Sequence, residues 1–380
     1  MSLFVCSDLH LGEAGSARMF HDPNQGKALA ALCAEVARRS GELILAGDIF
    51  DVTAAMPPAK GLTRFGRAVG AGKIEDKAPR SLKEVLQSIR RNNPIALDAL
   101  ELLSRDCLVT LVPGNHDRHL GGPDGREALS GAGLELVKIE AQAVRSLGEK
   151  IAVIQHGHLW DPSNATPSGG GEVMTGVLHN AVIPFLRQLQ ARKNVVIEPD
   201  RVVALRPEER VVPVLERWLP QGQFETFLDA FVEILVENGY LSRAISWLVT
   251  SDRIRERLKD DDDLWERAGR TALEALEGRR QLPGKPPPPD VLVLGHTHCV
   301  DWAVQEGAAA FDHATGRPGD PVQRLYVNLG TWSARASDAA GPLDPALPVL
   351  EIDLEQKRMV ALLRDLSSGG QTLQRFEAPR

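Results

Sequence analysis

The sequence predicts an α/β fold in which strands alternate with helices. Leu3–Ser7 is a short apolar strand, Gln25–Ser40 follows with apolar residues at helical spacing, and Glu42–Ala46 is a second strand that is apolar throughout. Continuous apolar runs of this length are typical of parallel strands that are buried on both faces. The beginning of the chain therefore predicts a βαβ unit, and with it a layered core of sheets covered by helices.

Further strands of the same kind follow along the chain. We expect them at Leu108–Val112, Ile151–Ile154, Val291–Leu294 and Arg324–Leu329, and a hairpin formed by Pro348–Ile352 and Met359–Leu363.

Two stretches interrupt this pattern. One is rich in Lys and Arg, and the other carries long helical patterns and ends in a proline run, which cannot continue a helix. We therefore predict a core of residues 1–160 and 290–365, a basic loop and helix insertion near the active site at 54–95, a mostly helical insertion at 161–289, and a C-terminal tail at 366–380.

The composition is that of a soluble protein of the size of an enzyme, and it indicates nothing more specific. The chain has 380 residues, of which 43% are hydrophobic and 25% are charged. Its apolar runs are far shorter than the roughly 20 residues that cross a bilayer, so no transmembrane segment is expected. The four cysteines are scattered, which predicts reduced thiols and a cytoplasmic location. Because 51 acidic residues outnumber 44 basic ones, the charge disfavours a nucleic-acid partner.

Acidic, amide and imidazole side chains gather at the C-terminal ends of five predicted strands. The five segments are Ser7-Asp8-Leu9-His10, Gly47-Asp48-Ile49-Phe50-Asp51, Pro113-Gly114-Asn115-His116-Asp117, Gln155-His156-Gly157-His158 and Gly295-His296-Thr297-His298. Each alone could be a turn or a surface loop. Ligands of open α/β sheets bind beyond the carboxyl ends of the strands, so we expect these side chains to converge.

The residue types indicate a metal centre. Imidazoles and carboxylates without cysteine suit Mn²⁺, Fe or Zn²⁺. The number of candidate ligands exceeds the need of one ion, so two are expected, and a carboxylate such as Asp48 can bridge them. Such a pair can acidify a water to hydroxide and hold the oxygens of a phosphoryl group. The pattern therefore predicts hydrolysis of a phosphate ester or phosphoanhydride.

In this order the five segments resemble the signature of the calcineurin-like metallophosphoesterase superfamily. The resemblance implies a four-layer α-β-β-α sandwich and two divalent ions, with Mn²⁺ favoured and Fe or Zn²⁺ as alternatives. It implies that one ion is held by Asp8, His10, Asp48 and His298, and the other by Asp48, Asn115, His156 and His296.

The same resemblance implies roles for two further residues. His116 would act on the leaving group, as a general acid or as a positive charge, and Asp51 would orient it. Val52 stands where phosphoprotein phosphatases have an arginine, which argues against that branch.

Weaker features bear on the substrate. His156–Asp161 and Tyr326–Trp332 partly match the UDP-2,3-diacylglucosamine hydrolases, which implies substrate contacts for His158 and Asp161. Arg64 and Arg67 of the basic stretch could contact phosphates, or belong to a solvated surface. The helical insertion could cap the active site, mediate a homodimer or hold an acyl chain.

The leading hypothesis is a metal-dependent hydrolase of a small phosphorylated metabolite, nucleotide, or nucleotide-sugar or lipid pyrophosphate. One alternative is a DNA nuclease of the SbcD type, since the first two segments also resemble that group, although the acidic balance outside 54–95 disfavours it. The other is a non-catalytic scaffold with the same fold, which would not need two intact sets of ligands.

Overall fold

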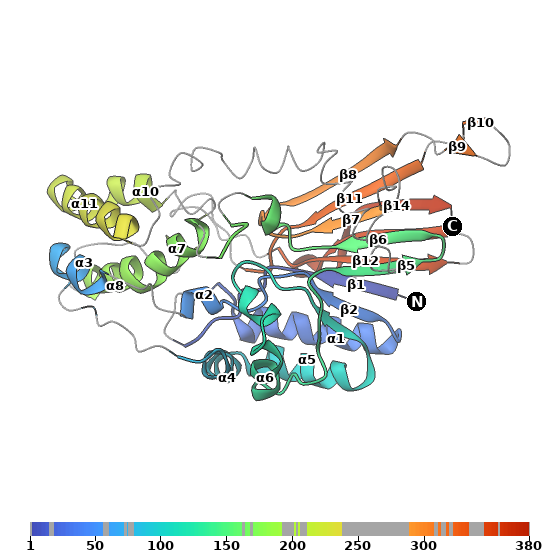
Figure 1. The fold of residues 1–380 in the computed structure, drawn as a ribbon, viewed down its shortest axis with the longest axis horizontal. Helices are drawn as coiled ribbons and strands as arrows, with labels where there is room; N and C mark the ends of the chain where they lie inside the picture. The colour runs from blue at the N-terminus through green and yellow to red at the C-terminus, as the bar shows by residue number, and fades with distance from the viewer. Residues whose placement is uncertain are drawn as a thin grey trace.

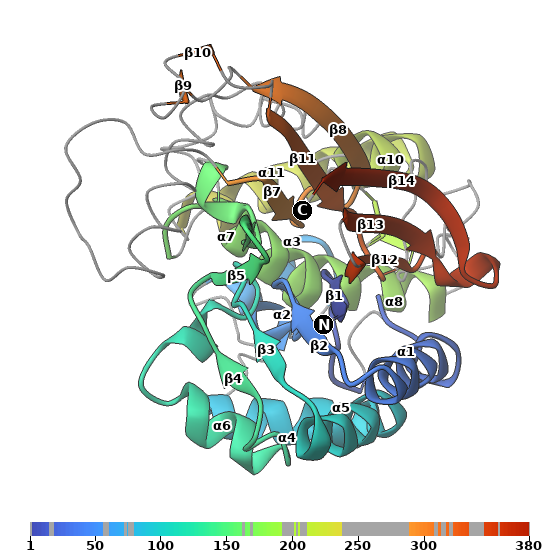
Figure 2. The ribbon, with the colours of Figure 1, turned by 90° about the vertical axis from the view of Figure 1, so that its right-hand side faces the viewer.

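The computed structural model describes residues 2–14, 19–55, 61–71, 74, 80–161, 164–167, 170–191, 201–202, 204–205, 211–237, 289–307, 311–312, 317–318, 322–333, 346–355 and 358–379. Residues 238–288 of the predicted helical insertion lie outside this part of the chain. Two β-sheets packed face to face form the centre of the molecule (Figures 1 and 2).

The larger sheet has the strand order β14-β13-β12-β1-β2-β3-β4. Its parallel half consists of β1 (Ser2–Cys6), β2 (Glu42–Leu45), β3 (Val109–Leu111) and β4 (Lys138–Ile139). Its antiparallel half consists of β12 (Pro348–Glu355), β13 (Arg358–Asp365) and β14 (Gln371–Pro379), and β12 pairs with β1. The C-terminal ends of β1, β2 and β3 therefore meet at one edge of the sheet.

The smaller sheet has the order β5-β6-β7-β11-β8. Its strands are β5 (Ala143–Leu147), β6 (Lys150–Ile154), β7 (Val291–Leu294), β11 (Val322–Leu329) and β8 (Val300–Gly307). The central three are parallel, and the two outer ones are antiparallel to their neighbours. A separate ladder is formed by β9 (Phe311–Asp312) and β10 (Arg317–Pro318).

The strands are apolar throughout because both of their faces are buried. In β1, Leu3 and Val5 face the smaller sheet, whereas Phe4 and Cys6 face the helices. These helices are α1 (Lys27–Arg38), α4 (Leu82–Asn92), α5 (Pro94–Asp106) and α6 (Gly125–Gly131) (Figure 2). The predicted α/β fold with two packed sheets is confirmed. The outer face of the smaller sheet is buried as well: Val153, Leu292, Leu294 and Tyr326 form an apolar cluster there, against which Trp160 packs.

A second group of helices lies beyond the end of the sandwich at which β1 and β2 terminate (Figure 1). We call it the helical subdomain; it comprises α3 (Leu62–Ala68), α7 (Gly170–Val177), η4 (Leu178–Val182), α8 (Ile183–Ala191), α10 (Val211–Trp218) and α11 (Gln221–Glu237). Its core includes the rings of Phe65, Phe185 and Phe227, whose centroids are 5.7 to 6.4 Å apart. The helix α2 (Val52–Ala55) links this subdomain to the loop after β2.

This arrangement divides the basic stretch that we expected to be one insertion. The helix α3 packs within the helical subdomain, together with α7, η4, α8, α10 and α11. The helix α4, by contrast, packs on the larger sheet through Val85, Leu86 and Ile89. The two predicted insertions therefore share one apolar core, because the buried face of α3 contacts α11.

The segment that we expected to be a C-terminal tail instead contains η8 (Leu366–Ser368) and the edge strand β14. Only alternate residues of this strand are buried: Phe376 and Ala378 join the core between the sheets, whereas Arg375 and Glu377 form a salt bridge on the outside. Polar residues on the open face hide such a strand from a search for apolar runs.

No helix in the described ranges is both long and apolar enough to span a membrane. Further short helical turns in the described ranges are η1 (Asp22–Gly26), η2 (Arg118–Gly121) and η3 (His158–Trp160).

Candidate metal centre

The loops after β1, β2 and β7 have a rare backbone conformation. Of the six non-glycine residues with positive φ in the described ranges, five are predicted ligands, with φ between 51° and 70°: Asp8, His10, Asp48, His296 and His298. Residues with a Cβ seldom adopt this conformation, and it persists where surrounding contacts enforce it, often at functional sites. Here the N–H groups of Asp8 and His10 donate to the carbonyls of Gly47 and Asp48, each at 2.9 Å, so the first two loops hold each other in place.

The four ligands predicted for the first ion converge. Asp8, His10, Asp48 and His298 are buried, and each offers a ligand atom within 4.8 Å of the others. His298 Nε2 lies 3.2 Å from both His10 Nε2 and Asp8 Oδ1. Asp8 Oδ1 is buried and has no hydrogen-bond partner in the described part of the chain. A buried carboxylate oxygen without a donor is costly, and a cation at the centre of this cluster would satisfy it.

The ligands predicted for the second ion also lie together. Asp48 belongs to this group as well, and it shares a potential metal site with His156 and His296. His156 Nε2 lies 3.0 Å from Asp48 Oδ2 and 3.1 Å from Asn115 Oδ1. The structure therefore brings all seven predicted ligands into two adjacent clusters that share Asp48.

The hydrogen bonds of His156 show which of its nitrogens is available. Its Nδ1 lies 3.0 Å from the carbonyl oxygen of Ala46 and donates to it, because a carbonyl can only accept. Its Nε2 then faces one oxygen of Asp48 and one of Asn115. Both oxygens are acceptors, because the Asn115 amide is oriented so that its Nδ2 donates to Asn164. Such a group of acceptors needs either a proton on Nε2 or a cation between them. The residues therefore fit a metal ion.

Two of the predicted ligands, Asp48 and His10, are held in forms that bind a metal ion. Burial by itself would raise the pKa of Asp48, but His156 and His116 outweigh it and hold that pKa well below its usual range. Burial, with the neighbouring imidazoles of His116 and His298, lowers the pKa of His10 well below its ordinary value. An ionised carboxylate and a neutral imidazole are the forms that bind metals.

His116 and Asp51 form a buried pair beside the first cluster. His116 Nδ1 lies 2.8 Å from Asp51 Oδ1, and the ring of His116 makes an edge contact with that of His10, with centroids 4.6 Å apart. Burial would raise the pKa of Asp51, but its hydrogen bond to His116 prevails and lowers it. Because Nδ1–H is held by this carboxylate, Nε2 is the nitrogen that His116 can offer to a substrate.

One residue at this pair was not found by sequence analysis. His179 Nε2 lies 3.9 Å from Asp51 Oδ2, and its side chain is only 4% exposed. His179 belongs to the π-helical turn η4 of the helical subdomain, and π-helical turns are frequent at functional sites. No motif surrounds it in the sequence, because its position depends on the packing of η4 and α7 against α2.

Two other residues hold the loops without facing the clusters. The Asp117 carboxylate accepts the N–H groups of Ile49 at 2.8 Å, Phe50 at 3.2 Å and Gly114 at 2.6 Å, so it ties the β3 loop to the β2 loop. Thr331 Oγ1 donates to the carbonyl of Asp8 at 2.9 Å. The segment Tyr326–Trp332, which we had related to substrate recognition by resemblance, thus supports the β1 loop.

The two polar residues after the β6 loop lie next to the second cluster. Asp161 Oδ2 is 2.9 Å from His296 Nε2 and accepts a hydrogen bond from Asn164 Nδ2 at 2.6 Å. The ring of His158 lies 5.4 Å from that of His156. Burial, together with His156 and His296, lowers the pKa of His158 to about 3, so its imidazole is neutral. Both residues therefore border the second cluster, and their contact with substrate stays a prediction.

The two arginines of the basic stretch lie elsewhere. Arg64 forms ion pairs with Glu237 and, at 3.2 Å, with Glu233, both on α11. Arg67 is exposed near the end of α3. Within the described ranges neither arginine contacts the clusters. Their sequence position after Asp51 suggested a substrate role, but the fold turns α3 toward the helical subdomain.

Comparison with known proteins gives limited information. No protein-family model and no curated protein matches the chain. Solved structures that match over 100% of this chain include a Streptococcus pneumoniae protein described as a predicted phosphoesterase (9% identity, 97% of that chain, TM-score 0.31). Vacuolar protein sorting 29 of Cryptosporidium parvum matches with 14% identity over 98% of that chain, with a TM-score of 0.31. The same protein of Entamoeba histolytica, in complex with zinc, matches with 10% identity over 99% of that chain, with a TM-score of 0.30. At these values the likenesses add nothing to what the site itself indicates.

Proposed function

We propose that the protein is a phosphoesterase that uses two divalent metal ions to hydrolyse a phosphate ester or phosphoanhydride. The observation that carries this proposal is the convergence of acceptor atoms around Asp48. His156 Nε2 lies 3.0 Å from Asp48 Oδ2 and 3.1 Å from Asn115 Oδ1, and in the adjoining cluster Asp8 Oδ1 has no hydrogen-bond partner among the described residues. In the metal-free protein these oxygens need a proton on His156 Nε2, and a bound cation would take the place of that proton.

Each cluster would hold one ion. Asp8, His10, Asp48 and His298 would hold the first, and Asp48, Asn115, His156 and His296 the second. Two ions bound there supply the charge that makes a water acidic and that neutralises phosphoryl oxygens. We propose Mn²⁺ as the working metal, because mixed nitrogen and oxygen ligands without thiolate suit it, with Fe and Zn²⁺ as the alternatives.

The chain's own residues complete the chemistry. His116 presents Nε2 toward the substrate and donates Nδ1–H to Asp51, which keeps the ring in one orientation. When Nε2 is protonated, His116 can give that proton to the departing oxygen. Asp51 stays ionised at neutral pH, because its pKa lies below its usual range, and so stabilises the charged imidazole.

The substrate class that we favour is a small phosphorylated metabolite, a nucleotide, or a nucleotide-sugar or lipid pyrophosphate. His158 and Asp161 border the second cluster, where the part of the substrate next to phosphorus would lie. All four cysteines are free, which supports a reducing, cytoplasmic location.

The test is metal-dependent hydrolysis of bis-p-nitrophenyl phosphate and p-nitrophenyl phosphate. Protein stripped with chelator and shown to be free of metal should be inactive, and Mn²⁺ should restore turnover. His116→Ala should lower kcat by roughly 100-fold, as expected for loss of a general acid, without lowering the bound metal. Full turnover by protein proven to be metal-free would contradict the proposal.

A further inference from the structure

The side chain of Asn164 lies between two of the ligands predicted for the second ion. Its Oδ1 accepts a hydrogen bond from Nδ2 of Asn115 at 3.3 Å, and its Nδ2 donates to Oδ2 of Asp161 at 2.6 Å. The same Asp161 oxygen lies 2.9 Å from Nε2 of His296. One amide is therefore connected to Asn115 directly and to His296 through Asp161.

The direction of these hydrogen bonds follows from the carboxylate of Asp161. A carboxylate accepts hydrogen bonds, so Asn164 turns its NH₂ group toward Asp161 and its oxygen toward Asn115. Facing that oxygen, Asn115 presents its own NH₂ group, which leaves Asn115 Oδ1 on the side of His156 Nε2, 3.1 Å away. In an amide group the oxygen, and not the nitrogen, is the acceptor that can bind a cation. Asn164 thus selects the ligand atom of Asn115.

The same carboxylate fixes the proton of the neutral imidazole of His296. Because Asp161 accepts, Nε2 of His296 donates to it, and Nδ1 is the nitrogen that keeps a lone pair. Carboxylates in such a position orient metal-binding histidines and raise their basicity. Asp161 therefore determines, directly or through Asn164, which atoms of two predicted ligands can hold an ion.

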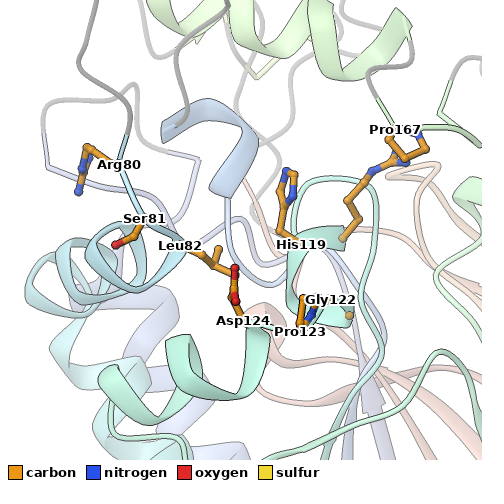
Figure 3. Close-up of a pocket in the computed structure, with 10 residues that line it drawn as sticks. Arg80, Ser81, Leu82, His119, Gly122, Pro123, Asp124 and Pro167 are labelled. Carbon is orange, nitrogen blue, oxygen red and sulfur yellow. The ribbon is translucent and has the colours of Figure 1, made fainter.

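The main chain around Asn164 is held by Arg118. Nη2 of Arg118 donates to the carbonyl of Asn164 at 2.7 Å, and its Nε donates to the carbonyl of Asn115 at 3.3 Å. Arg118 and Pro167 also line a cavity of about 730 Å³, with Arg80 on the opposite wall (Figure 3). Because a cavity borders the segment on this side, hydrogen bonds rather than dense packing hold Asn164 in place there.

We infer that Asn164 is a positioning residue that sets the affinity for the second ion. The inference rests on the proposed two-metal function and deepens it. Asp161, Asn164 and Arg118 form a clamp that acts on Asn115 and His296, and both of these are ligands of the second cluster only. Loss of the clamp should therefore weaken one ion and leave the other in place.

The test is calorimetric titration of metal-free protein with Mn²⁺. Asn164→Ala should weaken the second ion by roughly 10- to 100-fold, the range for loss of a partner that orients metal ligands, and leave the first unchanged. Gly171→Ala should act in the same direction without deleting the amide. A Cβ at Gly171 would lie 2.0 Å from Asn164 Oδ1 and 2.7 Å from its Cγ, so the amide has to move aside.

Gln142→Ala is the matched control. It removes another hydrogen bond between two amides, in which Gln142 accepts from Nε2 of Gln155 at 2.7 Å, and it should change neither affinity. The His298→Ala protein identifies the affected ion, because its first cluster lacks a ligand. In that background Asn164→Ala should weaken the ion that remains. Thermal melting of each metal-free variant shows whether the fold is kept.

The outcomes separate this inference from the proposed function. Two ions bound with wild-type affinity by Asn164→Ala and Gly171→Ala would overturn the clamp and leave the phosphoesterase proposal intact. Equal weakening of both ions, with a melting temperature below that of Gln142→Ala, would also overturn it, since that is general destabilisation. Selective weakening of one ion, while wild-type protein with two ions hydrolyses neither nitrophenyl ester, would support the clamp and overturn the proposed function. Wild-type protein that binds fewer than two ions would overturn both.

Discussion

His179 Nε2 lies 3.9 Å from the Asp51 oxygen that His116 does not use. The Asp51 carboxylate thus stands between two imidazoles, one from the loop after β3 and one from the helical subdomain. This contact joins His179 to Asp51 and not to a predicted metal ligand. We therefore regard His179 as a positioning residue for the His116–Asp51 pair. This relationship links the helical subdomain to the proposed chemistry.

Replacing His179 should therefore affect turnover more than substrate binding. We expect His179→Leu to lower kcat about tenfold with little change in KM, because a misplaced proton donor slows the reaction without altering ground-state contacts. His179→Gln keeps a side-chain donor and should recover part of the loss. Steady-state kinetics with bis-p-nitrophenyl phosphate, together with thermal melting of both variants, make the comparison. A rise in KM with unchanged kcat would contradict the positioning role.

Asp48 should control metal stoichiometry because it belongs to both clusters. We expect His298→Ala, which removes a ligand from the first cluster only, to leave about one ion per chain, and Asp48→Ala to leave less than one, as loss of a shared ligand demands. Elemental analysis after gel filtration in Mn²⁺ measures both. Equal stoichiometry in the two variants would argue against a bridging carboxylate.

The pH dependence of metal binding follows from His156. Burial alone would lower its pKa, but Asp48 and Asp8 outweigh burial and raise it from 6.5 to about 9 in the metal-free protein. Because a ligand must lose its proton to bind metal, we expect the affinity for Mn²⁺ to rise as the pH increases from 6.5 to about 9. Calorimetric titrations between these pH values check this, and affinity that is flat over the window would contradict the assignment.

The stability of the metal-free protein should change in the opposite direction. A histidine whose pKa is raised by folding contributes stability that is complete below its unfolded pKa of 6.5 and is lost as the pH rises through about 9. We therefore expect the free energy of unfolding of metal-free protein to fall over this range, and His156→Gln to reduce that slope. Urea unfolding at several pH values measures it; a stability that increased with pH over the range would be inconsistent with a raised pKa.

The close approach of the loops makes Gly114 sensitive to substitution. A Cβ at this position would lie 2.6 Å from the backbone nitrogen of Asp48 and 2.8 Å from Cδ2 of His156. We expect Gly114→Ala to cost roughly 1–3 kcal/mol in the free energy of unfolding, as overpacking does, and to weaken metal binding. Gly222→Ala in α11 is the control, since apart from its chain neighbours and the nearby helix backbone no described atom lies within 4 Å of the added Cβ. Equal stability of the two variants would show that the loops can separate.

The sequence was informative where structure is local. The strand β7 matches its expected range, and β1, β2, β3 and β6 differ from theirs by a residue at one or both ends, because strands buried on both faces are apolar throughout. The strand β8 was missed because Asp301 and Gln305 interrupt its apolar residues, so they form no continuous run: Trp302 packs against the core between the sheets, while Val300 and Val304 are exposed. The hairpin β12–β13 was found but is longer than expected.

The candidate site was predictable for a similar reason. Its predicted ligands directly follow buried strands, so topology alone brings them to one edge of the sheets. His179 and Arg64 were not predictable, because their partners are set by how helices pack. Arg64 and Glu233 are far apart in the chain, and nothing in the basic stretch indicates that its charge is already compensated by α11.

The shared core of α3 and the later helices has a consequence for engineering this chain. Phe65, from the excursion between β2 and β3, is enclosed by Phe185 and Phe227 from the excursion between β6 and β7. Deleting either excursion alone would remove the apolar contacts of the other and expose its aromatic side chains to solvent. Any graft of this unit onto another sandwich has to move both pieces at once, and a trimmed version of this protein has to lose both.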